Sequence, residues 1–101
     1  MGSESPKLSD ARTAFPARTA GEIWHARAHQ TSDAFWVRQG QSWRGYSWQA
    51  ADVMAKEIAA GLIERGLGQD ECVCLLGHTS FEWVLCDLAL VQAGAVSVPI
   101  Y

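Results

Sequence analysis

The sequence predicts an α/β fold that combines a β-hairpin, two long helices and a βαβ unit with parallel strands. Two aromatic-rich runs flank a Gln-Gly-Gln turn at residues 39–41, which indicates the hairpin. Apolar side chains recur at helical spacing over residues 48–65. Two short apolar runs, residues 71–76 and 95–100, enclose a second helical segment, and strands joined through a helix run parallel.

The composition is typical of a globular domain and argues against nucleic-acid binding. Of the 101 residues, 49% are hydrophobic and 19% charged, so a buried core is expected and a disordered chain is excluded. Five tryptophans are many for this length and need a deep core or a partner surface. The net charge of -3 provides no basic surface for a phosphate backbone, so we expect no nucleic-acid partner.

The cysteines and the hydropathy of the chain indicate a cytoplasmic protein. Cys72, Cys74 and Cys86 are an odd number and lie in apolar runs, so we expect reduced, buried thiols. The spacing of the first two is too short for a zinc knuckle. Residues 1–10 lack the apolar stretch of a secretory signal, and the apolar run at residues 83–91 is too short to span a membrane. Peripheral contact with a membrane stays open.

A lead-in and a short helix are expected before the hairpin. Residues 1–18 contain two prolines and scattered charges without periodicity, which indicates an extended segment. A helix is predicted over residues 19–30, with Thr19 as its N-cap and Glu22 completing a capping box. Its expected inward face consists of Ile23, Ala26 and Ala28.

The hairpin strands are expected at residues 34–38 and 42–48. Gly40 lies between them and supplies the positive φ that a tight turn needs. Both strands are rich in aromatic side chains, which favour a pleated, half-buried surface. The sequence therefore predicts a two-stranded antiparallel ribbon.

The first long helix is predicted to begin after Ser47, its N-cap, and to end at Arg65. Gly66 occupies the position of a left-handed C-cap, and Leu67 is placed to pack back on the last turn. One apolar stripe is expected to face the core: Trp48, Ala51, Ala55, Ile58, Ala59 and Leu62.

The βαβ unit is predicted over the last third of the chain. Residues 71–76 have the composition of a strand buried on both faces. Thr79 and Glu82 form the pattern of a capping box that opens a helix ending before Gly94. Residues 95–100 then form the second buried strand.

Two features indicate that residues 19–101 are an incomplete subdomain. The helix over residues 81–93 has no solvent face, because its polar side chains point in three separate directions: Glu82, Asp87 and Gln92. The parallel strand pair has no third strand, although parallel sheets are usually extended and covered on both faces. We therefore expect these residues to pack on the rest of their own large domain.

A series of short motifs follows in order from Tyr46 onward: Tyr46-Ser47-Trp48, Ile58-Ala59-Ala60-Gly61-Leu62, Gly66-Leu67-Gly68, Val73-Cys74-Leu75-Leu76-Gly77, Ser80-Phe81-Glu82-Trp83 and Leu88-Ala89-Leu90-Val91-Gln92-Ala93-Gly94-Ala95-Val96. In this order, the motifs from Ser47 to Tyr101 resemble the N-terminal region of the adenylate-forming (AMP-binding) superfamily of acyl-CoA synthetases. The closing Val98-Pro99-Ile100-Tyr101 is most like the long-chain fatty-acid branch. One departure is His78, where the family commonly has Asn.

The resemblance implies an enzyme of which this chain is the N-terminal scaffold. Such a ligase uses ATP, with Mg2+ offsetting phosphate charge, to convert a fatty acid to an acyl-adenylate, and then transfers the acyl group to CoA. The family's phosphate loop, nucleotide contacts and catalytic lysine align beyond Tyr101. No residue of this chain is therefore expected to be catalytic, to bind a cofactor or to ligate a metal, and residues 1–101 alone should be inactive. The alternative is a free-standing α/β binding or regulatory module without catalysis.

Two glycine-bearing segments have features of phosphate sites. Gly66-x-Gly68 follows a helix and lacks the third glycine of a dinucleotide fingerprint, so a helix cap is favoured. Residues 77–80 join a strand to a helix N-terminus, where backbone N–H groups suit an anion. The capping box is expected to satisfy those donors, so a structural role is favoured there too.

Three sets of side chains suggest chemistry or ligand binding by their residue types. One has the helical spacing of a metal site: Glu22, His25 and His29. A second has the residue types of a hydrolase triad: His78, Ser80 and Asp87. The third is an aromatic platform: Phe35, Trp36, Trp43, Tyr46 and Trp48. Polar neighbours indicate that the possible metal ligands lie on a solvated face. The lack of a nucleophile turn argues against the triad. For the aromatic platform, a role in the core or in a domain contact is favoured.

Overall fold

Three helices and four strands form within residues 19–100, the part of the chain that the computed structural model describes. Their order is α2 (Ala20–Arg27), β1 (Asp33–Gln39), β2 (Ser42–Ser47), α3 (Trp48–Glu64), β3 (Cys72–Leu76), α4 (Phe81–Gln92) and β4 (Val96–Ile100). The predicted mixture of a hairpin, two long helices and a βαβ unit is confirmed. The expected lead-in, residues 1–18, lies outside the described residues, as does Tyr101.

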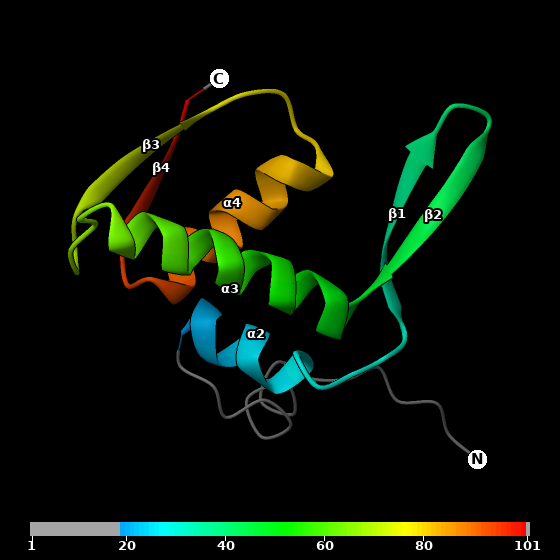
Figure 1. Ribbon diagram of the computed structural model, residues 1–101, viewed down its shortest axis with the longest axis horizontal. Helices are drawn as coiled ribbons and strands as arrows, with labels where there is room; N and C mark the ends of the chain where they lie inside the picture. The colour runs from blue at the N-terminus through cyan, green and yellow to red at the C-terminus, as the bar shows by residue number, and fades with distance from the viewer. Residues whose placement is uncertain (1–18, 101) are drawn as a thin grey trace, which may run out of the picture.

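The helices form the middle of the molecule and the two small sheets lie at its ends (Figure 1). Helix α3 runs across the centre, with α2 below it and α4 packed against it. The hairpin projects from one end, and the β3–β4 pair lies at the other. None of the helices within residues 19–100 has the length and apolar character needed to cross a bilayer.

The hairpin has the predicted turn. Gly40 has a φ of 62°, and Arg38 lies opposite Trp43 across the antiparallel pair. Strand β2 ends at Ser47, one residue earlier than predicted, because the Ser47 hydroxyl accepts a hydrogen bond from the Ala50 N–H at 3.0 Å and thereby starts α3.

Helix α3 packs through small side chains. Ala51, Ala55 and Ala59 are buried, as the stripe predicted, and the larger members of the stripe are half-buried. At its end Gly66 has a φ of 104°, and the Leu67 N–H bonds to the Leu62 carbonyl at 3.0 Å. The predicted left-handed cap is therefore confirmed.

The βαβ unit is parallel, as predicted, but its helix cap differs. Cys72 lies opposite Val96 in the β3–β4 pair. The N-cap of α4 is Ser80, whose hydroxyl accepts a hydrogen bond from the Trp83 N–H at 3.1 Å. The prediction of Thr79 as the cap was wrong, because the helix begins one residue later and Trp83, not Glu82, holds the third helical position.

The sheet β3–β4 is covered on one face only, which corrects the expectation of buried strands and thiols. Burial alternates along β3, so that Val73 and Leu75 are half-buried while Cys72, Cys74 and Leu76 are exposed. Leu76 is 76% exposed. The apolar run that predicted a doubly buried strand did not specify what covers its second face, and residues 19–100 supply only the α4 side. Cys86 on α4 is half-buried.

Helix α2 also turns a different face inward from the one predicted. Its Thr19 cap is confirmed, since the hydroxyl accepts a hydrogen bond from the Glu22 N–H at 3.1 Å. Trp24 and Ala28 are buried, whereas Ile23 is 50% exposed and Ala26 is exposed. The inward orientation of Ile23 and Ala26 was therefore wrong, because the larger Trp24 takes the core position.

An aromatic cluster joins the hairpin to the helices. Trp24 packs edge-on against Trp48 with 5.8 Å between ring centroids, and Phe35 contacts both rings. Tyr46 stacks on Phe81 of α4 at 4.5 Å. The inner hairpin aromatics therefore belong to the core, and this contact fixes where the hairpin meets α4.

Candidate functional site

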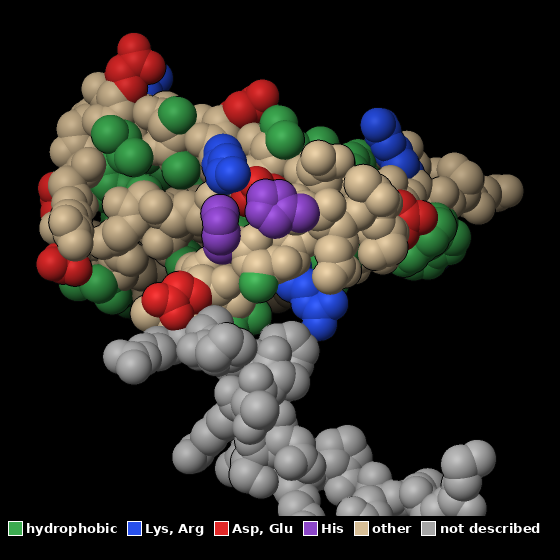
Figure 2. All heavy atoms as spheres, turned by 90° about the horizontal axis from the view of Figure 1, so that it is seen from below, with side chains coloured by type: hydrophobic (Ala, Val, Ile, Leu, Met, Phe, Trp, Pro, Cys, Tyr) green, Lys and Arg blue, Asp and Glu red, His purple; other side chains and the backbone are tan. Residues whose placement is uncertain are grey.

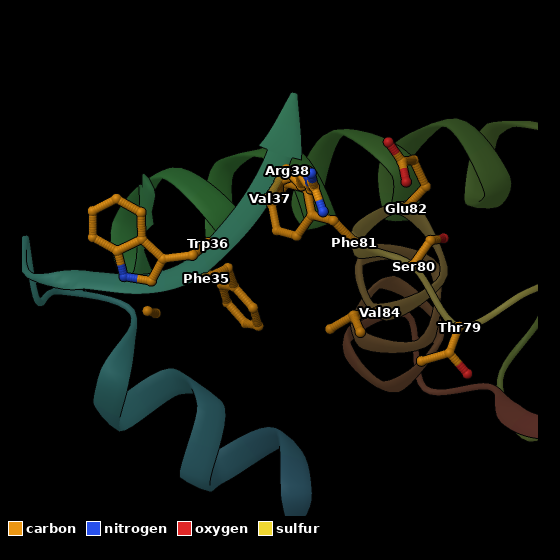
Figure 3. A pocket seen from close by; sticks show the side chains of 10 residues that line it. Phe35, Trp36, Val37, Arg38, Thr79, Ser80, Phe81, Glu82 and Val84 are labelled. Carbon is orange, nitrogen blue, oxygen red and sulfur yellow. The ribbon is translucent and has the colours of Figure 1, made fainter. Parts of the chain in front are cut away.

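A cleft of about 460 Å³ lies where β1 meets the start of α4 (Figure 3). Five of its lining residues come from the hairpin and five from the α4 region: Ala34, Phe35, Trp36, Val37, Arg38, Thr79, Ser80, Phe81, Glu82 and Val84. Figure 3 shows Phe35 and Val84 directed into the space between strand and helix, whereas Trp36 points away from it. The cleft is therefore an apolar recess with polar groups on its rim.

The aromatic side chains that form the cleft also make its lining largely apolar. Phe35 and Phe81 contact each other with tilted rings and 5.4 Å between ring centroids, and both contribute apolar surface to the lining of the cleft. On the rim, the Arg38 Nε donates to the Gly40 carbonyl at 3.0 Å. The recess has the chemistry to hold an apolar group, and we assign no reaction to it.

The strand-to-helix junction at residues 77–80 is used as a structural turn. Ser80 Oγ receives the Trp83 N–H, so one donor of the helix N-terminus is satisfied from within the chain. His78 and Thr79 are exposed, and Asp87 is half-buried further along α4. Ser80 Oγ, the expected nucleophile of the triad hypothesis, is thus engaged as a helix cap.

One histidine of α2 and one just beyond its C-cap lie together on the surface. The rings of His25 and His29 meet edge to face with 5.6 Å between centroids, and both are exposed. Figure 2 shows histidine side chains gathered on the face seen from below. Across residues 19–100, no three or more His, Cys, Asp or Glu side chains are arranged to hold a metal ion.

A buried polar network between α2 and α3 was not anticipated from the sequence. The Trp24 Nε1 donates to Asp52 Oδ1 at 2.8 Å, and Lys56 Nζ lies 2.8 Å from Asp52 Oδ2. Asp52 is only 6% exposed. The available signal was an acidic residue on the apolar side of α3, next to Ala51, with a lysine four residues later.

Comparison with known proteins defines the class. The sequence model of the family described as "AMP-binding enzyme" matches residues 23–101, which is most of the chain. The chain therefore belongs to the AMP-binding enzyme family. The predicted resemblance to adenylate-forming enzymes is confirmed.

Two relatives and one solved structure illustrate the similarity. The long-chain-fatty-acid–CoA ligase ACSBG2 of Mus musculus is 34% identical over 85 residues, covering 82% of this chain and 13% of the relative. The long-chain-fatty-acid–CoA ligase FadD15 of Mycobacterium bovis is 34% identical over 59 residues, 58% of this chain and 10% of the relative. A fatty acyl-adenylate ligase from L. pneumophila, solved with acyl adenylate and pyrophosphate, superposes with a TM-score of 0.72 at 24% identity, over 80% of this chain and 15% of that one.

These matches establish the family and the fold, and they also show how small a part of its relatives this chain spans. The chain spans about 13% of the length of the mouse relative. At 24% identity the structural match shows that the fold is shared, and nothing more. The hairpin, α3 and the βαβ unit are thus elements of an AMP-binding fold.

Proposed function

We propose that residues 19–101 are the N-terminal scaffold of a ligase that activates a fatty acid with ATP and transfers the acyl group to CoA. The observation that supports this most is the match of residues 23–101 to AMP-binding enzymes, together with relatives named as long-chain-fatty-acid–CoA ligases. A long acyl chain is the favoured substrate, because Pro99-Ile100-Tyr101 resembles that branch. In this proposal the described elements carry and orient other parts of the enzyme.

The chemistry assigned to the intact enzyme follows from the charge of its substrate. A carboxylate repels nucleophiles, and adenylation removes that charge while creating a good leaving group. ATP with Mg2+ would supply the adenylyl group, and the CoA thiol would accept the acyl chain. We assign nucleotide, Mg2+ and CoA binding to parts of the enzyme other than residues 19–100, because the glycine-bearing junction at 77–80 is engaged by its own Ser80 cap.

The open face of the small sheet is the proposed contact with the rest of the large domain. Four apolar side chains of β3 and β4 are well exposed: Leu76, Val96, Val98 and Ile100. Burying apolar surface is worth about 25 cal/mol for each Å² removed from water, so covering this face would stabilise the fold. A longer sheet with a second covering layer is the usual solution for parallel strands.

The experiment is an ATP–pyrophosphate exchange assay with the protein produced from its full natural reading frame. We expect exchange that depends on an added fatty acid, followed by thioester formation when CoA is present. A panel of short, long and aromatic acids tests the substrate class. Residues 1–101 alone should give only background exchange. Fatty-acid-dependent exchange by residues 1–101 alone would contradict the scaffold proposal. A reading frame that stops after Tyr101 would favour the binding module instead.

A further inference from the structure

Two histidines at helical spacing lie side by side at the C-terminal end of α2. His25 is in the last turn of the helix, and His29 follows four residues later, just beyond the C-cap Ala28. Ala28 keeps right-handed helical dihedrals, with a φ of -59° and a ψ of -18°, so the spacing still places both side chains on one side. Their rings accordingly meet with 5.6 Å between centroids.

This distance is close to the one that a shared metal ion requires. Metal–nitrogen bonds to imidazole are about 2.0–2.1 Å long, and the ring centroid lies about 1.1 Å behind the bonded nitrogen. Two imidazoles on one ion therefore have centroids roughly 4.4–5.2 Å apart for bond angles of about 90–110°. The observed 5.6 Å exceeds this range by only about 0.4 Å. Small side-chain rotations are able to close that gap, because both residues are exposed.

Both imidazoles are available to a cation. Across residues 19–100 neither ring takes part in a hydrogen bond or an ion pair. A neutral imidazole then offers one nitrogen lone pair to a ligand. The C-terminal end of a helix carries partial negative charge, so the position of the pair also favours a cation. The net charge of -3 acts in the same direction.

We propose that His25 and His29 chelate one divalent cation of the late first-row transition series, such as Ni2+ or Cu2+. Two histidines four residues apart on a helix face are a metal-binding arrangement, and imidazole suits these ions. Glu22 does not complete the site, because within residues 19–100 no three such side chains are arranged around an ion. Water fills the remaining positions, so binding is reversible. The proposal replaces the sequence-based expectation that no residue of the chain ligates a metal.

The histidine pair is separate from the surfaces discussed for the ligase. None of the residues that line the cleft between β1 and α4 belongs to α2. The open face proposed to contact the rest of the domain belongs to β3 and β4. Metal binding therefore does not rest on the proposed function. The two proposals fail independently, one by calorimetry with a metal ion and the other by pyrophosphate exchange.

The test is isothermal titration calorimetry with Ni2+, on the protein from its full natural reading frame and without a histidine tag. Ni2+ is the probe because thiolates select zinc and reduced copper. We expect a dissociation constant of about 1–100 µM. H25Q and H29Q should each weaken binding at least tenfold, roughly, because each removes one of two ligands. H78Q changes an exposed histidine of the 77–80 junction and should bind like the wild type.

A spacing variant separates chelation from the number of histidines. H29Q/Q30H exchanges two exposed neighbours, so composition and charge stay the same while the two histidines become five residues apart. This variant should lose affinity as H29Q does, because only side chains three or four residues apart are neighbours on a helix surface. Wild-type affinity in H29Q/Q30H would overturn the proposal.

Chemical modification locates the bound ion. In the wild type, Ni2+ should protect His25 and His29, and not His78, from diethyl pyrocarbonate, read by mass spectrometry of peptides. The proposal is wrong if Ni2+ does not bind to the wild type, if H78Q loses as much affinity as H25Q, or if His25 and His29 stay reactive at saturating Ni2+.

Discussion

The indole N–H of Trp24 on α2 donates a 2.8 Å hydrogen bond to the carboxylate of Asp52 on α3, and both side chains are buried. The second carboxylate oxygen meets Lys56 one turn further along α3. A tryptophan that buries this much surface still needs a partner for its N–H, and a carboxylate is a strong acceptor. The bond therefore explains both why Trp24 is the inward residue of α2 and how an acid is tolerated beside the core.

Removing the acceptor should destabilise the protein. D52A leaves the Trp24 N–H buried without a partner, so we expect a loss of about 1–3 kcal/mol in the free energy of unfolding, measured by urea titration. K56A should cost no more than about 1 kcal/mol, because Lys56 is 56% exposed. E57A on the exposed side of α3 is the control. Equal stability of D52A and E57A would show that the buried bond is not important.

Two glycines of the same helix region should respond in opposite directions to alanine. Gly66 has a φ of 104°, a conformation that L-residues avoid, so G66A should lower stability by roughly 1–2 kcal/mol. Gly61 lies inside α3 with open space around a Cβ, so G61A should raise stability by about 0.5–1 kcal/mol. Thermal unfolding of both variants compares them. A stabilising G66A would contradict the left-handed cap.

The cap of α4 can be separated from its neighbour in sequence. S80A removes the hydroxyl that accepts the Trp83 N–H and should cost about 1 kcal/mol. T79A changes an exposed side chain one residue earlier and should be nearly neutral. Denaturant unfolding of the pair gives the measurement. The reverse order would restore Thr79 as the cap.

Thiol labelling reports on the open face of the small sheet. In residues 1–101 alone, exposed Cys72 and Cys74 should react quickly with a thiol reagent, and half-buried Cys86 more slowly. In the protein from the full reading frame, all three should resist until denaturant is added, because we expect the rest of the domain to cover this face. The C86S variant isolates the two strand thiols. Fast native labelling of the longer protein would rule out that covering contact.

Much of the fold was predictable because its signals are local. The Gly40 turn, the Ser47 cap and the Gly66 C-cap each depend on residues within one turn of the chain, and all three were confirmed. The family also followed from short motifs in a fixed order, and residues 23–101 match AMP-binding enzymes. The shift from Thr79 to Ser80 shows the limit of local pattern, since both residues are able to cap and the helix start decides between them.

The sequence by itself determined the order and type of the elements, the small-residue stripe of α3 and the family, because each is encoded in spacing along the chain. Only the tertiary structure decided which side chains contact residues that are distant in the sequence. Trp24 meets Asp52 because the fold places α2 beside α3, and Trp36 and Trp43 are left in solvent because the opposite face of the hairpin packs on Phe81. Burial depends on what lies opposite a residue in space, which its neighbours in sequence do not specify.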